Sequence, residues 1–437
     1  MRRKFISSAS HHERGQTMIL VAVSIVSLLA MAALAIDVVT LYVARTEIQG
    51  AADAAALAGA KAIADSGLTS MPSTDGNFAA AQALAQSMAT SAVAAVLASP
   101  NNQVAGVALA AAPAFNFAVN VNGAINNPRI TVSLTRAGLP TFFAHIWGRT
   151  AVTVSTSATA EAYNPSNTAN FTQISPKGVK PWLVANRDPT QGVNTPFVDP
   201  ATGNVESGAI ANQDFWLSAD CQGGRHRCHL ANLTPGVVTG TLPQPQVQYV
   251  PALATANTAN VCNSSCASGS DYQNSIQCAD MNPYQCGGGA TNAEWDMVDR
   301  INPSGPSSTS RDTTDGVECL IHATGQGPGQ GQDTINWTSW PTNPIQISPS
   351  DSTNLMSTSS SIVSIPIIDV TNPLSTTNPA VTVIGFLQAF VEQIDANNNI
   401  QIKVMNVVGC GQNPNAAATV TGGNTSSPIP IRLITPP

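Results

Sequence analysis

Cysteine and histidine side chains that could bind a metal ion gather in the second half of the chain. Thiolate and imidazole groups suit the tetrahedral coordination of structural zinc. Four such residues lie at short spacings, Cys221, His226, Cys228 and His229, and Cys262 and Cys266 follow later in the chain. Their spacing fits no common zinc module, and exported cysteines oxidise. All eight cysteines of the chain are disulfide candidates: Cys221, Cys228, Cys262, Cys266, Cys278, Cys286, Cys319 and Cys410. We therefore favour disulfides over zinc, with the pairing left open.

Residue patterns for catalysis are sparse. The sequence has no Gly-x-Ser-x-Gly elbow, no His-Glu-x-x-His and no Walker loop. His145 lies in an apolar run beside Phe143 and Trp147, which is typical of a buried histidine. A further cluster holds five carboxylates that miss the alternate-residue spacing of an EF-hand, so we interpret them as solvated loop residues: Asp296, Asp299, Asp312, Asp315 and Glu318. We predict a non-enzymatic protein without a cofactor.

One apolar stretch decides where all these residues lie. From Thr17 to Ile36 there is no charged side chain, and twenty helical residues span about 30 Å, the hydrocarbon thickness of a bilayer. Basic residues resist translocation, and four precede the stretch: Arg2, Arg3, Lys4 and Arg14. The twenty residues beyond it contain only one basic residue, Arg45. We predict a single-pass protein with residues 1–16 in the cytoplasm, a span at 17–36 and the bulk of the chain exported.

A cleavable secretory signal is the rival interpretation of the same stretch. A basic start, an apolar core and Ala33, Leu34 and Ala35 at its end are typical of such signals. The apolar run is longer than a usual signal core, however, and the helical pattern continues through the would-be cleavage point. An exported chain that begins at Ile36 would remove the predicted anchor.

Asp37 follows the predicted span directly. An acid inside a membrane is usually functional, but at the outer edge it can reach water. We interpret Asp37 as a marker of the interface, and the alternative is a contact with a partner helix.

Composition and charge indicate which fold and function classes suit the exported part of the chain. Charged residues make up 10% of the 437 residues and aromatic residues 5%, while 43% are hydrophobic. Such a mixture favours turn-rich β domains over a cytosolic enzyme core. The whole chain carries a net charge of −7. Residues 1–16 carry +3, so the rest of the chain carries −10. An acidic exported part argues against nucleic-acid binding.

The order of patterns along the chain predicts an α+β fold. Residues 37–98 are an Ala-rich helical stalk, broken near Gly67. Residues 99–164 alternate with a period of two and predict a small antiparallel β domain, so that helix and sheet follow a pilin-like plan. Residues 165–437 are expected to be a mainly β, disulfide-stapled exported region. Its clearest strands flank an Asp/Asn-rich turn at 395–399.

A family resemblance rests on a combination of residues around the span. The matching features are the apolar span itself and ten residues before and after it: Gly15, Asp37, Tyr42, Arg45, Gln49, Ala51, Asp53, Ala54, Ala55 and Ala56. Together they resemble the N-terminal segment of TadE/TadG-like proteins of the bacterial Flp (Tad) pilus assembly system. Prepilin processing in the related pseudopilins uses a Gly followed five residues later by Glu. Here Leu20 occupies that position after Gly15, so the chain resembles the uncleaved TadG type.

The resemblance implies a function and a location. It implies a non-enzymatic component of pilus assembly, anchored in the bacterial inner membrane, that acts through helix packing and exported-domain contacts. The implied partners are the inner membrane and other Tad pilus-assembly proteins or pilins, and no nucleic acid. The alternative is an anchored periplasmic or surface binding or adhesion module that pilus assembly does not require. A membrane-tethered hydrolase is a third hypothesis, for which the sequence offers no motif.

Overall fold

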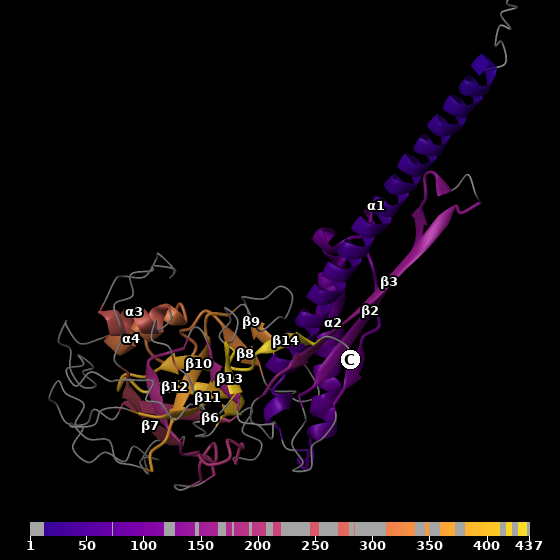
Figure 1. Cartoon of the computed structure of the whole chain (residues 1–437). Coiled ribbons are helices and arrows are strands. Elements are labelled where there is room, and N and C mark those ends of the chain that lie inside the picture. Colours follow the sequence, from indigo (N-terminus) through magenta and orange to yellow (C-terminus); the bar gives the residue numbers. More distant parts are fainter. Residues whose placement is uncertain are drawn as a thin grey trace, which may run out of the picture. The chain divides into compact units, whose positions relative to one another are not determined.

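The structure of the chain is a computed structural model. It describes residues 13–71, 73–117, 127–144, 148–164, 172–176, 179–191, 195–206, 213–219, 245–252, 270–278, 284, 312–336, 346–348, 359–371, 381–410, 417–421 and 427–434. Within these residues the predicted α+β class is confirmed, because a long N-terminal helix precedes a largely β region (Figure 1).

Helix α1 runs without interruption from Glu13 to Asp65. Ala, Leu, Glu and Gln dominate its sequence, and these residues have high helix propensity. The chain leaves the helix at Gly67, whose φ of 79° is open to glycine and strained for other residues. The short helix η1 (Leu68–Ser70) follows, then α2 (Phe78–Ala98) and η2 (Pro100–Asn102). The prediction of one long N-terminal helix is therefore confirmed.

A four-stranded sheet has the order β1-β2-β3-β14. Its strands are β1 (Ala114–Asn116), β2 (Arg129–Pro140), β3 (Ala151–Ala162) and β14 (Ile431–Ile434). Side chains alternate along β2, so that Ile130, Val132 and Leu134 are buried on one face. The end of the chain completes the sheet, since β14 pairs antiparallel with β3.

Six strands form a closed barrel in the order β10-β11-β12-β6-β7-β5. They are β5 (Trp182–Ala185), β6 (Asp214–Ala219), β7 (Gln246–Pro251), β10 (Ile362–Ile368), β11 (Val383–Ile394) and β12 (Ile400–Gly409). The β11–β12 hairpin around the 395–399 turn is confirmed by its antiparallel register. Parallel pairs, β10 with β5 and β6 with β7, close the barrel, and the sequence did not predict that closure.

The remaining elements are short. Strand β4 (Thr172–Ser175) pairs with β13 (Ala417–Thr421), and β8 (Thr334–Asn336) pairs with β9 (Gln346–Ser348). Helices α3 (Asp271–Gln277) and α4 (Asp312–Leu320) were not predicted. The interpretation of Asp312, Asp315 and Glu318 as loop residues is wrong, because all three lie on α4. Asp312 also accepts a hydrogen bond of 2.6 Å from Ser270 Oγ, the residue that caps α3. Asp296 and Asp299 lie outside the described residues.

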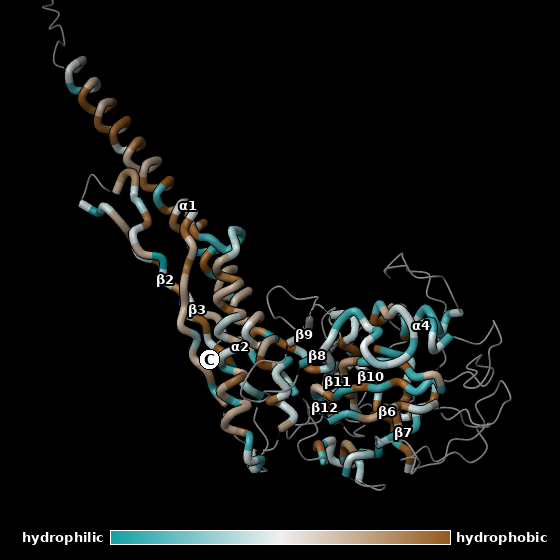
Figure 2. Tube along the Cα trace, turned by 180° about the vertical axis from the view of Figure 1, so that it is seen from behind, coloured by the Kyte–Doolittle hydropathy of each residue, from teal (hydrophilic) through white to brown (hydrophobic). Residues whose placement is uncertain are grey.

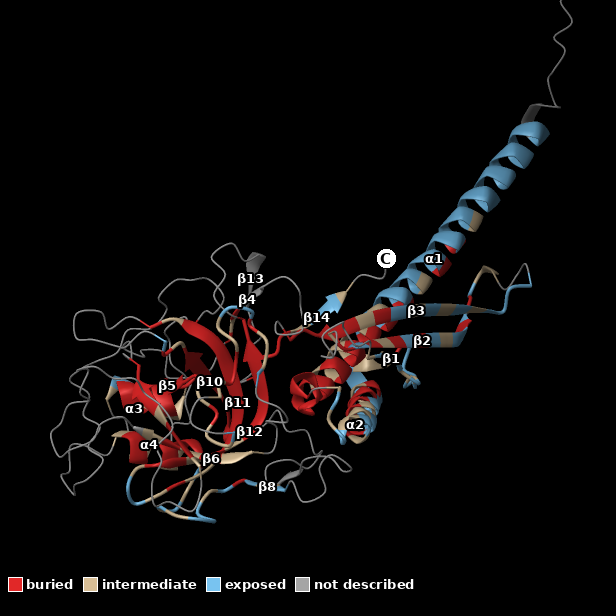
Figure 3. Cartoon of the chain, turned by 90° about the horizontal axis from the view of Figure 1, so that it is seen from below, coloured by how far each residue is buried: buried red, intermediate tan, exposed pale blue. Residues whose placement is uncertain are grey.

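The chain divides into two compact units. The first comprises residues up to Ala55, Ala94–Ala112 and Val132–Ala158; the second comprises Ala56–Val93, Pro113–Thr131 and the chain from Thr159 onward. Helix α1 contributes residues to both. The barrel belongs to the second unit, and every residue of β10 in it is buried (Figure 3).

Three predicted disulfide cysteines are among the described residues. Cys278, Cys319 and Cys410 are each disulfide-bonded. Cys278 ends α3, Cys319 lies on α4 and Cys410 follows β12. The other five lie outside the described residues: Cys221, Cys228, Cys262, Cys266 and Cys286.

Candidate functional site

The first half of α1 presents apolar side chains on its surface. Met18 is 77% exposed, and large apolar residues remain exposed as far as Val43. Figure 2 shows this part of the helix as its most hydrophobic stretch, and Figure 3 shows it exposed. Among the described residues two helices are long and apolar enough to cross a membrane, Gly15–Asp65 and Phe78–Ala98. The apolar window of the first is not buried at all, whereas that of the second is partly buried, as in a core helix. An exposed apolar surface of this length fits lipid better than water.

Asp37 binds the loop that joins β2 to β3, in the first unit. The backbone N–H of Phe142 donates to Asp37 Oδ1 at 2.9 Å, and those of Phe143 and Ala144 donate to Oδ2 at 3.0 and 2.6 Å. Three successive N–H groups around one carboxylate resemble the capping of a helix N-terminus. The side chain is only 3% exposed. Contrary to our expectation, Asp37 therefore does not reach water but joins two elements of its own chain. Its role as a marker of the membrane interface stays a prediction.

Two opposing effects act on the Asp37 carboxyl group, one residue beyond the predicted span 17–36. Burial raises its pKa, and the hydrogen bonds from Ala144, Phe142 and Phe143 lower it. Together the three bonds outweigh burial, so the pKa of Asp37 lies below its ordinary value. The carboxylate is thus held in its charged form, and the loop that it binds is held with it.

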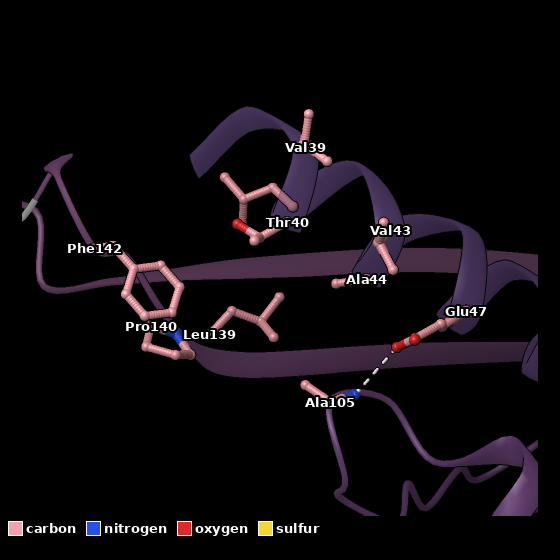
Figure 4. A pocket seen from close by; sticks show the side chains of 10 residues that line it. Val39, Thr40, Val43, Ala44, Glu47, Ala105, Leu139, Pro140 and Phe142 are labelled. Carbon is pink, nitrogen blue, oxygen red and sulfur yellow. Dashed lines mark hydrogen bonds between the residues drawn. The ribbon is translucent and has the colours of Figure 1, made fainter. Parts of the chain in front are cut away.

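An apolar hollow of about 320 Å³ adjoins this contact, also within the first unit. Figure 4 shows Val39, Val43 and Ala44 of α1 on one side and Leu139, Pro140 and Phe142 on the other. Its far end is polar, where Glu47 Oε2 accepts a hydrogen bond of 3.2 Å from the N–H of Ala105. Phe142 is 62% exposed. The hollow can hold an apolar group, but it offers little for polar chemistry.

The family-motif residues beyond Asp37 fall into two groups. Tyr42 and Arg45 are exposed. Gln49 instead bonds within the first unit, donating to Asp53 Oδ1 at 2.7 Å and accepting from the hydroxyl of Thr156 on β3. Ala51, Ala55 and Ala56 are buried, and Ala54 is partly buried. The motif thus includes residues that hold α1 in its own fold.

The small-residue face of α1 is filled by the chain itself in the second unit. A Cβ atom at Gly59 would overlap Cδ1 of Ile130 on β2 and lie 3.2 Å from Cγ2 of Val93 on α2. An alanine here would force the Ile130 side chain to shift, so glycine allows β2 and α2 to approach α1 closely. At Gly59 the neighbours of α1 are thus β2 and α2 of the same chain.

A buried polar network joins η1 and the end of α1 to the barrel, within the second unit. Asn406 of β12 is fully buried and donates to the carbonyl of Ala64 at 2.9 Å and to Oε1 of Gln388 at 2.6 Å. Ser70 donates to the carbonyl of Val407 at 3.0 Å and accepts from the Val407 N–H at 2.9 Å. Satisfied buried networks of this kind fix one arrangement. The sequence offered no signal for this contact beyond the Asn and Gln within apolar strands.

A charged cluster lies on three barrel strands. Lys403 Nζ of β12 is 2.6 Å from Asp214 Oδ1 of β6 and 4.0 Å from Glu392 Oε1 of β11. Burial and the negative charge of Asp214 raise the pKa of Glu392 to about 7, although Lys403 opposes this shift.

Some of the topology, motif and metal-site residues predicted from the sequence lie outside the described residues, and others lie on α1. Arg2, Arg3 and Lys4 lie outside the described residues, as do His145 and the alternative zinc ligands Cys221, His226, Cys228, His229, Cys262 and Cys266. Arg14 and Gly15 lie in the first turn of α1, and Thr17 and Ile36 lie inside this helix. In the described part of the chain, no group of three or more His, Cys, Asp or Glu side chains is arranged to hold a metal ion.

Comparison with known proteins identifies the first part of the chain. Residues 15–62 match the family model for TadE/G-like Flp pilus-assembly proteins. No curated protein and no solved structure matches the chain. The matched residues are those that carried the resemblance in the sequence, so the resemblance is confirmed over this segment.

Proposed function

We propose that this chain is a membrane-anchored, non-enzymatic component of Flp (Tad) pilus assembly, of the TadG type. The observation that carries the proposal is that the family match at 15–62 coincides with α1. The first half of this helix is apolar and exposed, and the second half is packed against the rest of its own chain. Such a helix suits an anchor that carries an exported body.

The proposed topology is a single pass through the bacterial inner membrane. Residues 1–16 lie in the cytoplasm because Arg2, Arg3, Lys4 and Arg14 resist translocation. Residues 17–36 span the bilayer and 37–98 form the stalk. Residues 99–164 supply three strands of the small sheet, which β14 completes, and 165–437 form the main exported region. The oxidising compartment on the exported side then accounts for disulfides, and we propose that all eight cysteines form them.

Partner contacts are assigned to two surfaces. Because the small-residue face around Gly59 is occupied by β2 and α2, we assign helix packing with other Tad proteins or pilins to the exposed first half of α1. The exported region provides the second surface. Its acidic character makes nucleic acid an unsuitable partner.

An anchored binding or adhesion module is the second candidate. The observation that favours it is that the family match ends at residue 62, so the barrel is not part of the matched segment. Deletion of the gene separates the two functions. Loss of pili, restored by the full-length chain, supports assembly; normal pili with altered surface attachment supports adhesion and contradicts the first proposal.

A further inference from the structure

We infer that the tip of the β2–β3 hairpin, residues 141–144, is a second membrane contact that places the Phe142 side chain among the phospholipids around α1. The inference rests on the proposed membrane anchoring of α1. It adds a lipid-binding surface to a part of the chain outside the predicted span.

The depth of the tip follows from Asp37. Its carboxylate binds the N–H groups of residues 142–144 directly, so the tip lies beside the first residue beyond the span. The interfacial layer of a bilayer extends about 5–8 Å beyond the hydrocarbon core. A group held next to Asp37 therefore lies within that layer on the exported side.

The surface of the tip suits lipid. Phe142 is 62% exposed, although burying an aromatic side chain is worth about 2 kcal/mol. Val38, Val39 and Tyr42 follow Asp37 on α1 by one, two and five residues and are also exposed. The hollow lined by Val39 and Leu139 continues their apolar surface (Figure 4). Aromatic side chains are enriched where hydrocarbon meets head groups.

Charge at the tip fits the head groups of phospholipids. Arg149 is exposed, and its backbone is bound to the tip, because its N–H donates to the carbonyl of Ala144 at 3.2 Å. The Thr141 hydroxyl also donates to the Arg149 carbonyl. A guanidinium at this level can bind lipid phosphate. By contrast, Glu47 at the far end of the hollow lies ten residues beyond Asp37, about 15 Å along the helix.

The occupant is therefore a phospholipid rather than a partner helix. The part of α1 that lines the hollow runs from Val39 to Glu47, which is about 12 Å of helix. A transmembrane partner helix is about 30 Å long, so the hollow could contact only a small part of it, whereas an acyl chain and its glycerol can occupy a short apolar hollow.

Site-specific photo-crosslinking tests the inference. The full-length chain, carrying p-benzoylphenylalanine at Phe142, is reconstituted in vesicles of phosphatidylethanolamine and phosphatidylglycerol, irradiated and analysed by mass spectrometry. Leu28, exposed within the predicted span, is the positive control. Val107 is the negative control: it is exposed and bridged to Val104, and the loop between them is held at the level of Glu47.

The inference predicts lipid adducts at positions 28 and 142 and none at 107. An adduct at 28 without one at 142, a protein adduct at 142 in place of lipid, or lipid adducts at all three positions would overturn it while leaving the anchor intact. Absence of an adduct at 28 would contradict the anchor itself and, with it, the proposed function. The two failures are thus distinguishable.

Discussion

Replacing Gly59 by alanine tests whether the outer half of α1 packs within its own chain. A methyl group at Gly59 would overlap Ile130, whereas a methyl group at Gly50, in the same helix, would have no atom within 4 Å. Gly50→Ala is thus a matched control for Gly59→Ala. We expect Gly50→Ala to stabilise the helix locally and Gly59→Ala to destabilise it.

The magnitude follows from the two environments. Both substitutions gain the helix propensity of alanine over glycine, about 1 kcal/mol. Gly59→Ala also inserts a methyl group into a filled site, and overpacking costs about 1–3 kcal/mol. The propensity cancels between the variants, so their difference should equal the packing cost. At a factor of ten for each 1.4 kcal/mol, this is about 5- to 150-fold in the local opening equilibrium.

Hydrogen–deuterium exchange of α1 amides in the full-length chain measures that difference. Exchange near residue 59 should accelerate in Gly59→Ala, and exchange near residue 50 should slow in Gly50→Ala. Ile130→Val removes the overlapping methyl group, so Gly59→Ala should cost at least about 1 kcal/mol less in that background. Equal protection by both alanine substitutions would refute the contact between α1 and β2.

Three further predictions concern charged and polar groups. Asp37→Asn should accelerate amide exchange at residues 142–144 by at least about tenfold; because the pKa of Asp37 is lowered, the wild-type contact should persist at neutral pH and be lost only as the pH falls below 3.8. Asn406→Ala leaves its buried hydrogen-bond partners unpaired and should lower the free energy of unfolding by about 2–4 kcal/mol in urea titrations. Asn397→Ala, in an exposed turn, should change it by less than about 0.5 kcal/mol. Since the pKa of Glu392 is raised to about 7, stability should fall between pH 4.5 and 7; Glu392→Gln should remove this loss and be roughly 1–3 kcal/mol more stable than wild type at pH 8.

The sequence predicted those helices, strands and turns whose formation depends on residues close together in the chain. The uncharged apolar stretch and the Ala-rich sequence after it predicted α1, and alternation predicted β2 and β3. The Asp/Asn-rich turn predicted the β11–β12 hairpin. In each case the pattern lies within the element or within the turn that joins two neighbours.

Contacts between distant residues could not be predicted in this way. Asp37 binds backbone N–H groups more than a hundred residues away, and no side-chain pattern marks a backbone donor. The barrel closes through parallel pairs such as β5 with β10. The apolar sequences of these strands predict that they are buried but do not indicate which strand each one pairs with. Helix α4 contains Thr313, Thr314 and Gly316, which have poor helix propensity; it packs closely on α3, where a Cβ at Gly316 would lie 3.0 Å from Ile276.

The most direct test of the membrane-anchored role in pilus assembly is to count pili on cells whose only copy of the chain has residues 1–36 replaced by a cleavable secretory leader. Immunoblots first establish that the released chain is exported at the wild-type level. Anchoring through α1 predicts cells without pili, while the full-length chain restores them. Wild-type numbers of pili on cells with the released chain would contradict the proposed role of the anchor.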